Sequence, residues 1–110
     1  MKEITYKDVL NEVKTYIKED KELKVIDDAY NFASICHKGR TRKNGESYIS
    51  HPLNVAMILT TLNVDYVTIA SALLHETINH GGATKEQIEE QFGSEIASIV
   101  NSISKINRLS

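Results

Sequence analysis

Two histidines and a carboxylate stand close together in the stretch LLHETINHGG, residues 73–82. His75 and Glu76 are adjacent, and Asn79 and His80 follow about one helical turn later. Imidazole and carboxylate groups at this spacing are typical of metal sites for zinc, manganese or iron. They are also common in hydrogen-bonded polar patches on helices, so the spacing alone leaves both interpretations open.

The zinc-protease motif His-Glu-x-x-His does not fit this stretch, because Asn79 stands where the second histidine would have to be. On one continuous helix, His75 and Asn79 would share a face, since four residues return about 40° past a full turn. Glu76 and His80 would share a second face about 100° away. We therefore expect His80 to point away from His75.

His51 is a third candidate metal ligand. It opens an earlier predicted helix and precedes Pro52, a residue favoured in the first turn. Helices joined by a short connection pack antiparallel, so this helix should return beside the one that carries His75. Whether the two imidazoles meet depends on the crossing geometry, which the spacing does not determine.

Helical periodicity accounts for most of the chain. One proline and five glycines leave few breaks, and apolar residues recur at helical spacing. The basic stretch KGRTRKNGES, residues 38–47, interrupts the pattern and is expected to be a loop. The sequence predicts one all-α domain over residues 1–110, a compact bundle of about six helices. The predicted helices are 6–18, 24–37, 50–63, 64–80, 84–93 and 94–109.

The composition is that of an ordinary globular domain, with 41% hydrophobic and 25% charged residues. The net charge of -2 gives no reason to expect direct binding to nucleic acid or to a membrane. The single cysteine, Cys36, has no partner for a disulfide, and its apolar neighbours suggest a buried thiol without a catalytic role. With no apolar signal region at the start, the chain is expected to be cytoplasmic.

Two longer stretches closely resemble a known family. They are HKGRTRKNGESYISHPLNVAMILTTLNVDYVTIASALLHE, residues 37–76, and TKEQIEEQFGSEIASIVNSISKI, residues 84–106. Several motifs occur in order: the His-x-Gly to His-Pro run, the Leu-Leu-His helix, and a Phe-Gly followed by a Ser-Lys. Together they resemble the HD hydrolase domain of the RelA/SpoT family, which makes and degrades the alarmone (p)ppGpp. The resemblance runs from about Ile26 to Leu109 and implies a helical HD bundle whose later helices lie beyond Ser110.

The resemblance implies a manganese site. In the family's hydrolases, Mn2+ is held by the histidine of the His-Pro motif, here His51, and by a His-Asp pair, here His75 and Glu76. A further aspartate ligand of the family would fall beyond Ser110. Glutamate still ligates a hard cation, but its extra methylene shifts the carboxylate by roughly a bond length, more than the ~0.2 Å tolerance of a metal site.

The catalytic positions depart from the family's pattern. Family hydrolases resemble His-Asp-x-x-Glu-Asp, and the acidic pair corresponds here to Asn79 and His80. Asparagine cannot take up a proton, and lost acid–base catalysis typically costs about 10²–10⁴-fold in rate. The replacement predicts an inactive hydrolase site.

Arg42 and Lys43 match the Arg-Lys of the family that contacts the guanine nucleotide. Arginine stacks on a base and lysine meets phosphate as a point charge. A solvated basic loop is the alternative interpretation for these two residues. For His37 and Tyr48, which also match the family, a structural hydrogen-bonding role beside the loop is expected.

Two functional hypotheses follow from the resemblance. The favoured one is a hydrolase-inactive regulatory HD module of a longer GTP pyrophosphokinase, with a synthetase domain in the same chain and (p)ppGpp as a ligand. The alternative is an active, metal-dependent (p)ppGpp 3′-pyrophosphohydrolase in which Glu76 is a ligand and His80 the acid–base group. A helical binding module without a nucleotide partner is a third, weaker reading.

Overall fold

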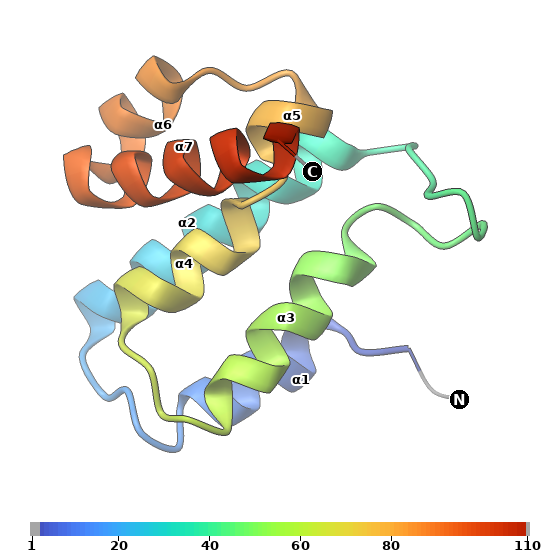
Figure 1. Ribbon diagram of the computed structural model, residues 1–110. Coiled ribbons are helices and arrows are strands. Elements are labelled where there is room, and N and C mark those ends of the chain that lie inside the picture. Colours follow the sequence, from blue (N-terminus) through green and yellow to red (C-terminus); the bar gives the residue numbers. More distant parts are fainter. Residues whose placement is uncertain (1–2, 110) are drawn as a thin grey trace.

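The chain folds into seven helices in the computed structural model, which describes residues 3–109 (Figure 1). Within these residues there is no strand, and the predicted all-α class is confirmed. None of the described helices is both long and apolar enough to cross a bilayer. The helices are α1 (Tyr6–Val13), α2 (Asp20–His37), α3 (Ser50–Thr60), α4 (Tyr66–Leu74), α5 (Thr77–Gly81), α6 (Lys85–Phe92) and α7 (Ser94–Leu109).

Local capping signals fix several helix starts. Asp65 accepts a hydrogen bond from the Thr68 backbone N–H at the start of α4. Thr84 and Gln87 form a reciprocal capping box at the start of α6, as the sequence predicts. The helix ends at Gly93, whose φ of 91° lies in the left-handed region that favours glycine.

The predicted helix over 64–80 is wrong in one respect, because it is two helices. α4 ends at Leu74 and α5 begins at Thr77, with Glu76 between them at φ -103° and ψ 0°. The predicted sharing of a helix face by His75 and Asn79 is therefore also wrong, since it requires an unbroken helix. The break occurs at the two residues with the clearest metal-binding chemistry.

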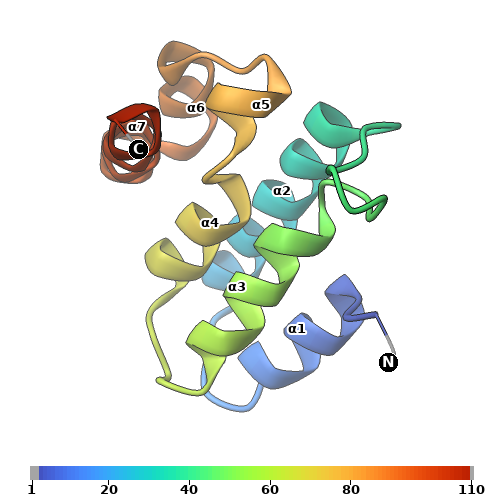
Figure 2. The same cartoon turned by 45° about the vertical axis from the view of Figure 1, so that its right-hand side comes forward.

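α2 and α4 lie side by side at the centre of the molecule (Figures 1 and 2). Seven of the nine residues of α4 are buried, which makes it the central helix. α3 packs along α4, and α1 packs against α3. On the other side of α4 lies α7, which packs against both α4 and α6. Ala29, Ala33 and Ala70 are fully buried on the two central helices, and their small side chains suit close packing.

The loop between α2 and α3 folds back on itself as a short hairpin. Thr41 and Ser47 form an isolated antiparallel bridge, and the Arg42 backbone N–H donates to the Glu46 carbonyl at 2.7 Å. Gly45 turns the tip at a φ of 88°. This hairpin holds the Arg42 and Lys43 segment beside the junction of α4 and α5.

Candidate metal centre

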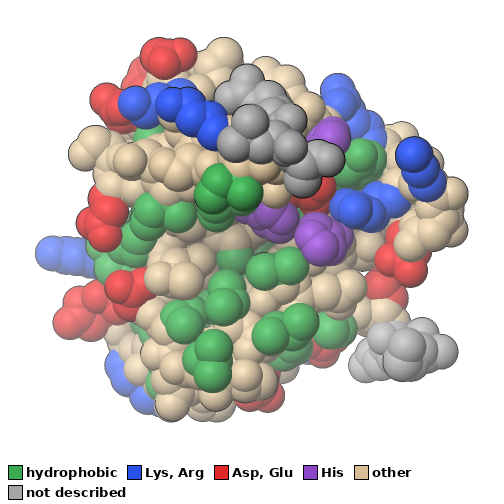
Figure 3. Space-filling view, in the orientation of Figure 1, with side chains coloured by type: hydrophobic (Ala, Val, Ile, Leu, Met, Phe, Trp, Pro, Cys, Tyr) green, Lys and Arg blue, Asp and Glu red, His purple; other side chains and the backbone are tan. Residues whose placement is uncertain are grey.

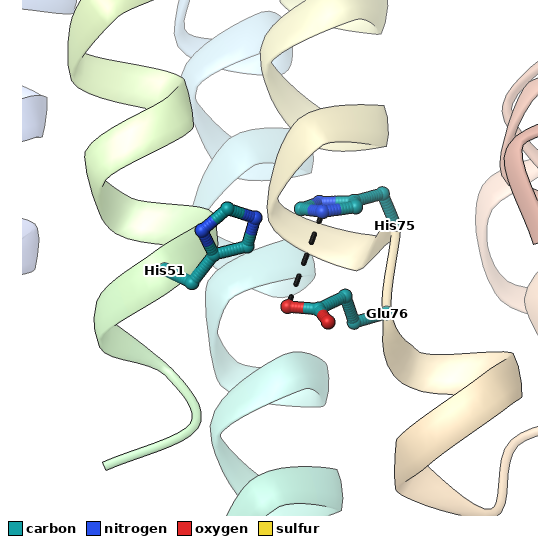
Figure 4. A group of neighbouring side chains, drawn as sticks. All are labelled: His51, His75 and Glu76. Carbon is teal, nitrogen blue, oxygen red and sulfur yellow. Dashed lines mark ion pairs between the residues drawn. The ribbon is translucent and has the colours of Figure 1, made fainter. Parts of the chain in front are cut away.

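Three side chains from two helices and a turn converge on one point. His51 comes from the first turn of α3, His75 from the C-terminal end of α4, and Glu76 from the break before α5 (Figure 4). One ligand atom from each lies within 4.8 Å of the others. The structure thus brings together the three residues that the sequence predicts as metal ligands.

A hydrogen bond to the backbone orients His75. Its Nδ1 lies 2.6 Å from the Ala72 carbonyl, which accepts a hydrogen bond and so requires the proton to be on Nδ1. Nε2 is then left with a lone pair, and it lies 4.0 Å from the Glu76 Oε1. A histidine fixed through its other ring nitrogen is the usual arrangement in metal sites.

The surroundings of His51 favour its neutral form by lowering its pKa. Burial lowers the pKa of His51, the Glu76 carboxylate opposes this effect, and His75 and Arg42 add to it. The His51 and His75 rings meet edge to face with centroids 5.3 Å apart. Because only the neutral imidazole binds a metal, this environment favours ligation.

The arrangement fits a divalent transition metal. At ligand distances of about 2.0–2.2 Å, neighbouring ligand atoms lie roughly 3–4 Å apart. The observed limit of 4.8 Å is wider, so small side-chain rotations would bring His51, His75 and Glu76 around one ion. Two imidazole nitrogens and one carboxylate suit manganese, iron or zinc.

Arg42 contacts the carboxylate of this cluster. Its Nη1 donates to Glu76 Oε1 at 3.0 Å and lies 3.4 Å from Oε2, and its guanidinium carbon lies 5.3 Å from the centre of the Tyr48 ring. Arginine over an aromatic face is a favourable cation–π arrangement. A surface pocket opens here, lined by Arg42, Lys43, Asn44, Tyr48, Glu76 and His80.

Asn79 serves a packing role. Its Nδ2 donates to the Ser104 carbonyl at 3.1 Å, and the Ser104 hydroxyl donates to Asn79 Oδ1 at 2.7 Å. This reciprocal pair joins α5 to α7, and Ser104 is fully buried. Asn79 is not among the described residues that line the pocket, although the family resemblance assigns it a catalytic position.

His80 lies within a group of stacked rings. Tyr48 stacks on His37 and lies tilted by 33° against His80, with both centroid distances at 5.5 Å, and Arg40 donates to the His80 carbonyl oxygen. His80 therefore reaches the pocket through its ring while its backbone is held by the loop. The role predicted for His37 and Tyr48 is structural, but it is carried by stacking, since neither ring nitrogen of His37 has a partner in the described structure.

Three residues that support the site were missed by the sequence reasoning. Ser104 and Arg40 hold α5 through Asn79 and the His80 backbone. A Cβ added at Gly81 would lie 2.8 Å from the Cys36 Cβ, so α5 can approach α2 only with glycine there. Of the three, Ser104 alone carried a signal, as part of the Ser-Lys motif.

Comparison with known proteins places this chain among HD domains. The sequence profile of the HD domain matches residues 29–110. The chain is 41% identical over 97 residues to the bifunctional (p)ppGpp synthase/hydrolase SpoT of Escherichia coli (strain K12), covering 88% of this chain and 14% of that protein. It is 43% identical over 91 residues to a GTP pyrophosphokinase of Myxococcus xanthus, covering 83% of this chain and 12% of that protein.

A third relative, from Aquifex aeolicus (strain VF5), is a guanosine-3′,5′-bis(diphosphate) 3′-pyrophosphohydrolase. It is 46% identical over 81 residues, which cover 74% of this chain and 12% of the relative. The chain thus spans only 12–14% of the length of these relatives, which are much longer proteins.

Proposed function

The chain belongs to the HD domain family, in its RelA/SpoT branch, and on that premise we propose that it is a nucleotide-binding regulatory module without hydrolase activity. Its ligand would be guanosine-3′,5′-bis(diphosphate), and its setting a longer GTP pyrophosphokinase with a synthetase domain. The metal that its ligand cluster would hold is Mn2+. One observation carries the proposal. The Asn79 side chain is hydrogen-bonded to Ser104, and the His80 ring lies against Tyr48.

The charges in the pocket favour binding of a diphosphate. Arg42 and Lys43 bring two cations to the pocket wall, and Glu76 is its one acidic residue among the described lining residues. Glu76 already accepts a hydrogen bond from Arg42, so its charge is largely compensated. Arg42 over the Tyr48 ring also offers a flat surface on which a nucleobase can stack.

The same pocket is poorly equipped for hydrolysis. A metal bound by His51, His75 and Glu76 would polarise a phosphate oxygen or lower the pKa of a water molecule. An attacking water also needs a group that positions it and accepts its proton. Asn79 has no basic side chain and is committed to Ser104, which leaves only the His80 imidazole for that role.

Binding and hydrolysis can be tested on the same protein. Isothermal titration calorimetry with guanosine-3′,5′-bis(diphosphate) measures affinity, and pyrophosphate release in the presence of Mn2+ measures turnover. We expect binding without release. Replacing Arg42 with alanine should weaken binding by about tenfold to a hundredfold, because a hydrogen bond to a charged group contributes about 1.5–3 kcal/mol.

Lys38 supplies a matched control. It is an exposed cation at the start of the same loop and is not one of the described residues that line the pocket. Lys38→Ala removes one positive charge, as Arg42→Ala does, and should change the affinity by less than about threefold. Equal losses in the two variants, or absence of binding by the unmodified chain, would contradict the proposed nucleotide pocket.

An active 3′-pyrophosphohydrolase is the second candidate, and the position of His80 favours it. The His80 ring lines the pocket with Glu76, so an imidazole is available near the metal cluster as an acid–base group. If the unmodified chain releases pyrophosphate and His80→Gln abolishes the release, this second function replaces the first. The affinity for the nucleotide measured by calorimetry then applies to either function.

A further inference from the structure

The Arg42–Glu76 ion pair uses the oxygen atom that a metal would need. Glu76 Oε1 lies 3.0 Å from Arg42 Nη1, and the same oxygen atom lies 4.0 Å from His75 Nε2. Glu76 is buried, at 7% exposure. The guanidinium and the imidazoles therefore approach the same carboxylate from two sides.

A divalent ion and the guanidinium would compete for this carboxylate. Two cations held a few ångströms apart repel strongly where water is largely excluded. With both in place, the cluster would hold three positive charges against the single carboxylate of Glu76. The favourable states have either Arg42 or the metal on Glu76 Oε1.

We propose that Arg42 is an exchangeable cap on the metal centre, which the metal displaces and thereby releases for anion binding. Once displaced from Glu76, the guanidinium remains in the pocket with Lys43 and can pair with a phosphate group. Metal binding and diphosphate binding then strengthen each other. The inference rests on the metal site and the pocket of the proposed function and adds a coupling between them.

The surroundings of Arg42 allow this exchange. The residue belongs to the hairpin loop between α2 and α3, and its side chain is 33% exposed, whereas that of Glu76 is only 9% exposed. Glu76 is fixed at the start of α5, while Arg42 rests against the Tyr48 ring. A guanidinium stacked on a ring can slide across the ring face while keeping its cation–π contact.

The test is the affinity for Mn2+ in the absence of nucleotide, measured by calorimetry and by the loss of the free-ion electron paramagnetic resonance signal. We compare the unmodified chain with Arg42→Gln and with Lys43→Gln. Lys43 is an exposed neighbour that lines the same pocket, so both variants lose one positive charge there. Circular dichroism verifies that the helical content of each variant is unchanged.

Arg42→Gln should bind Mn2+ about tenfold more tightly, within the 5–150-fold range typical of coupled sites. Lys43→Gln should change the affinity by less than about threefold, because an exposed charge is well screened. Equal effects in the two variants would overturn the cap, since they would reflect only the net charge. Weaker binding in Arg42→Gln, or no Mn2+ binding in any variant, would also overturn it.

A second titration separates this inference from the proposed function. In the unmodified chain, saturating Mn2+ should tighten binding of guanosine-3′,5′-bis(diphosphate) by the same factor by which the nucleotide tightens binding of Mn2+. Nucleotide binding that does not respond to Mn2+ would leave the proposed pocket standing and refute the exchange. Tighter Mn2+ binding in Arg42→Gln without any nucleotide binding would support the cap and refute the pocket.

Discussion

His75 and Glu76 of the His51–His75–Glu76 cluster are followed within about one turn by the Asn79–His80 pair, and the two groups differ in what their side chains do. The first group converges, with ligand atoms within 4.8 Å of one another. The second group diverges: Asn79 is hydrogen-bonded to Ser104 on α7, whereas the His80 ring lies tilted against Tyr48. The first group has a geometry that could hold a metal ion, and the side chains of the second group make packing contacts.

The contrast shows that the two groups depend on different parts of the fold. The residues of the cluster are held by α3, by the end of α4 and by the turn, elements that the core packing already requires. Asn79 and His80 instead connect α5 to α7 and to the loop between α2 and α3. The two groups can therefore be tested separately.

The largest expected effect comes from breaking the converging group. His75→Ala should weaken Mn2+ binding by at least about a hundredfold, because loss of outer-sphere partners alone costs 10–100-fold. His80→Ala removes a neighbouring imidazole that belongs to the diverging pair, and it should change the affinity by less than about threefold. Calorimetry with Mn2+ measures both. Comparable losses in the two variants would erase the distinction between the groups.

The diverging group should show its effect in stability. Asn79→Ala removes both hydrogen bonds to Ser104 and should lower the free energy of unfolding by about 2 kcal/mol, measured by urea denaturation. Asn54→Ala, at an exposed asparagine of α3, should lower it by less than about 0.5 kcal/mol.

A double-mutant cycle with Ser104→Ala sharpens the same point. Because the Asn79 and Ser104 side chains bond directly to each other, their effects should not add. Additive losses would mean that Asn79 stabilises the chain through other contacts. Mn2+ affinity should stay within about threefold of the unmodified value in each variant.

The smallest effect concerns the pH dependence of stability. Burial lowers the pKa of His37, a shift that Glu76 opposes and that Arg40, His80 and His75 reinforce. The unfolded chain takes up a proton at this histidine near pH 6.5, whereas the folded chain takes it up only at a lower pH. The contribution of His37 is therefore complete above about pH 6.5 and is lost as the pH falls from there toward its lowered pKa.

His37→Phe tests this assignment, since it keeps a ring against Tyr48 but cannot titrate. Urea denaturation at about pH 7.5 and about pH 5 should show a smaller loss of stability on acidification in the variant than in the unmodified chain. An identical loss in both proteins would assign the pH dependence to other groups, such as His51, whose pKa is also lowered by burial.

The predictable parts of this molecule are those encoded over a few residues. The capping box of Thr84 and Gln87 and the N-cap at Asp65 are visible in the sequence, and both helix starts are found in the structure. Helical periodicity locates the helical segments, except that the one predicted over 64–80 contains two helices. The three metal-ligand candidates follow from residue type and from the family resemblance, and the structure brings them together.

Other features depend on contacts between distant residues. No glycine or proline marks the break at His75 and Glu76, so the local sequence reads as one helix there. The Asn79–Ser104 pair spans 25 positions, and the meeting of His51 with His75 depends on how α3 crosses α4. A helical-wheel projection cannot predict these features, because it assumes one continuous helix and describes no contact between helices.

The break between α4 and α5 divides the metal centre between two mechanical units. His75 lies at the end of α4, which is buried in the core, whereas Glu76 stands at the N-cap position of α5, which the Asn79–Ser104 pair ties to α7. α7 itself packs against α4 and is tied to α5 through Ser104, so the last helix bridges the two units that carry the His75 imidazole and the Glu76 carboxylate.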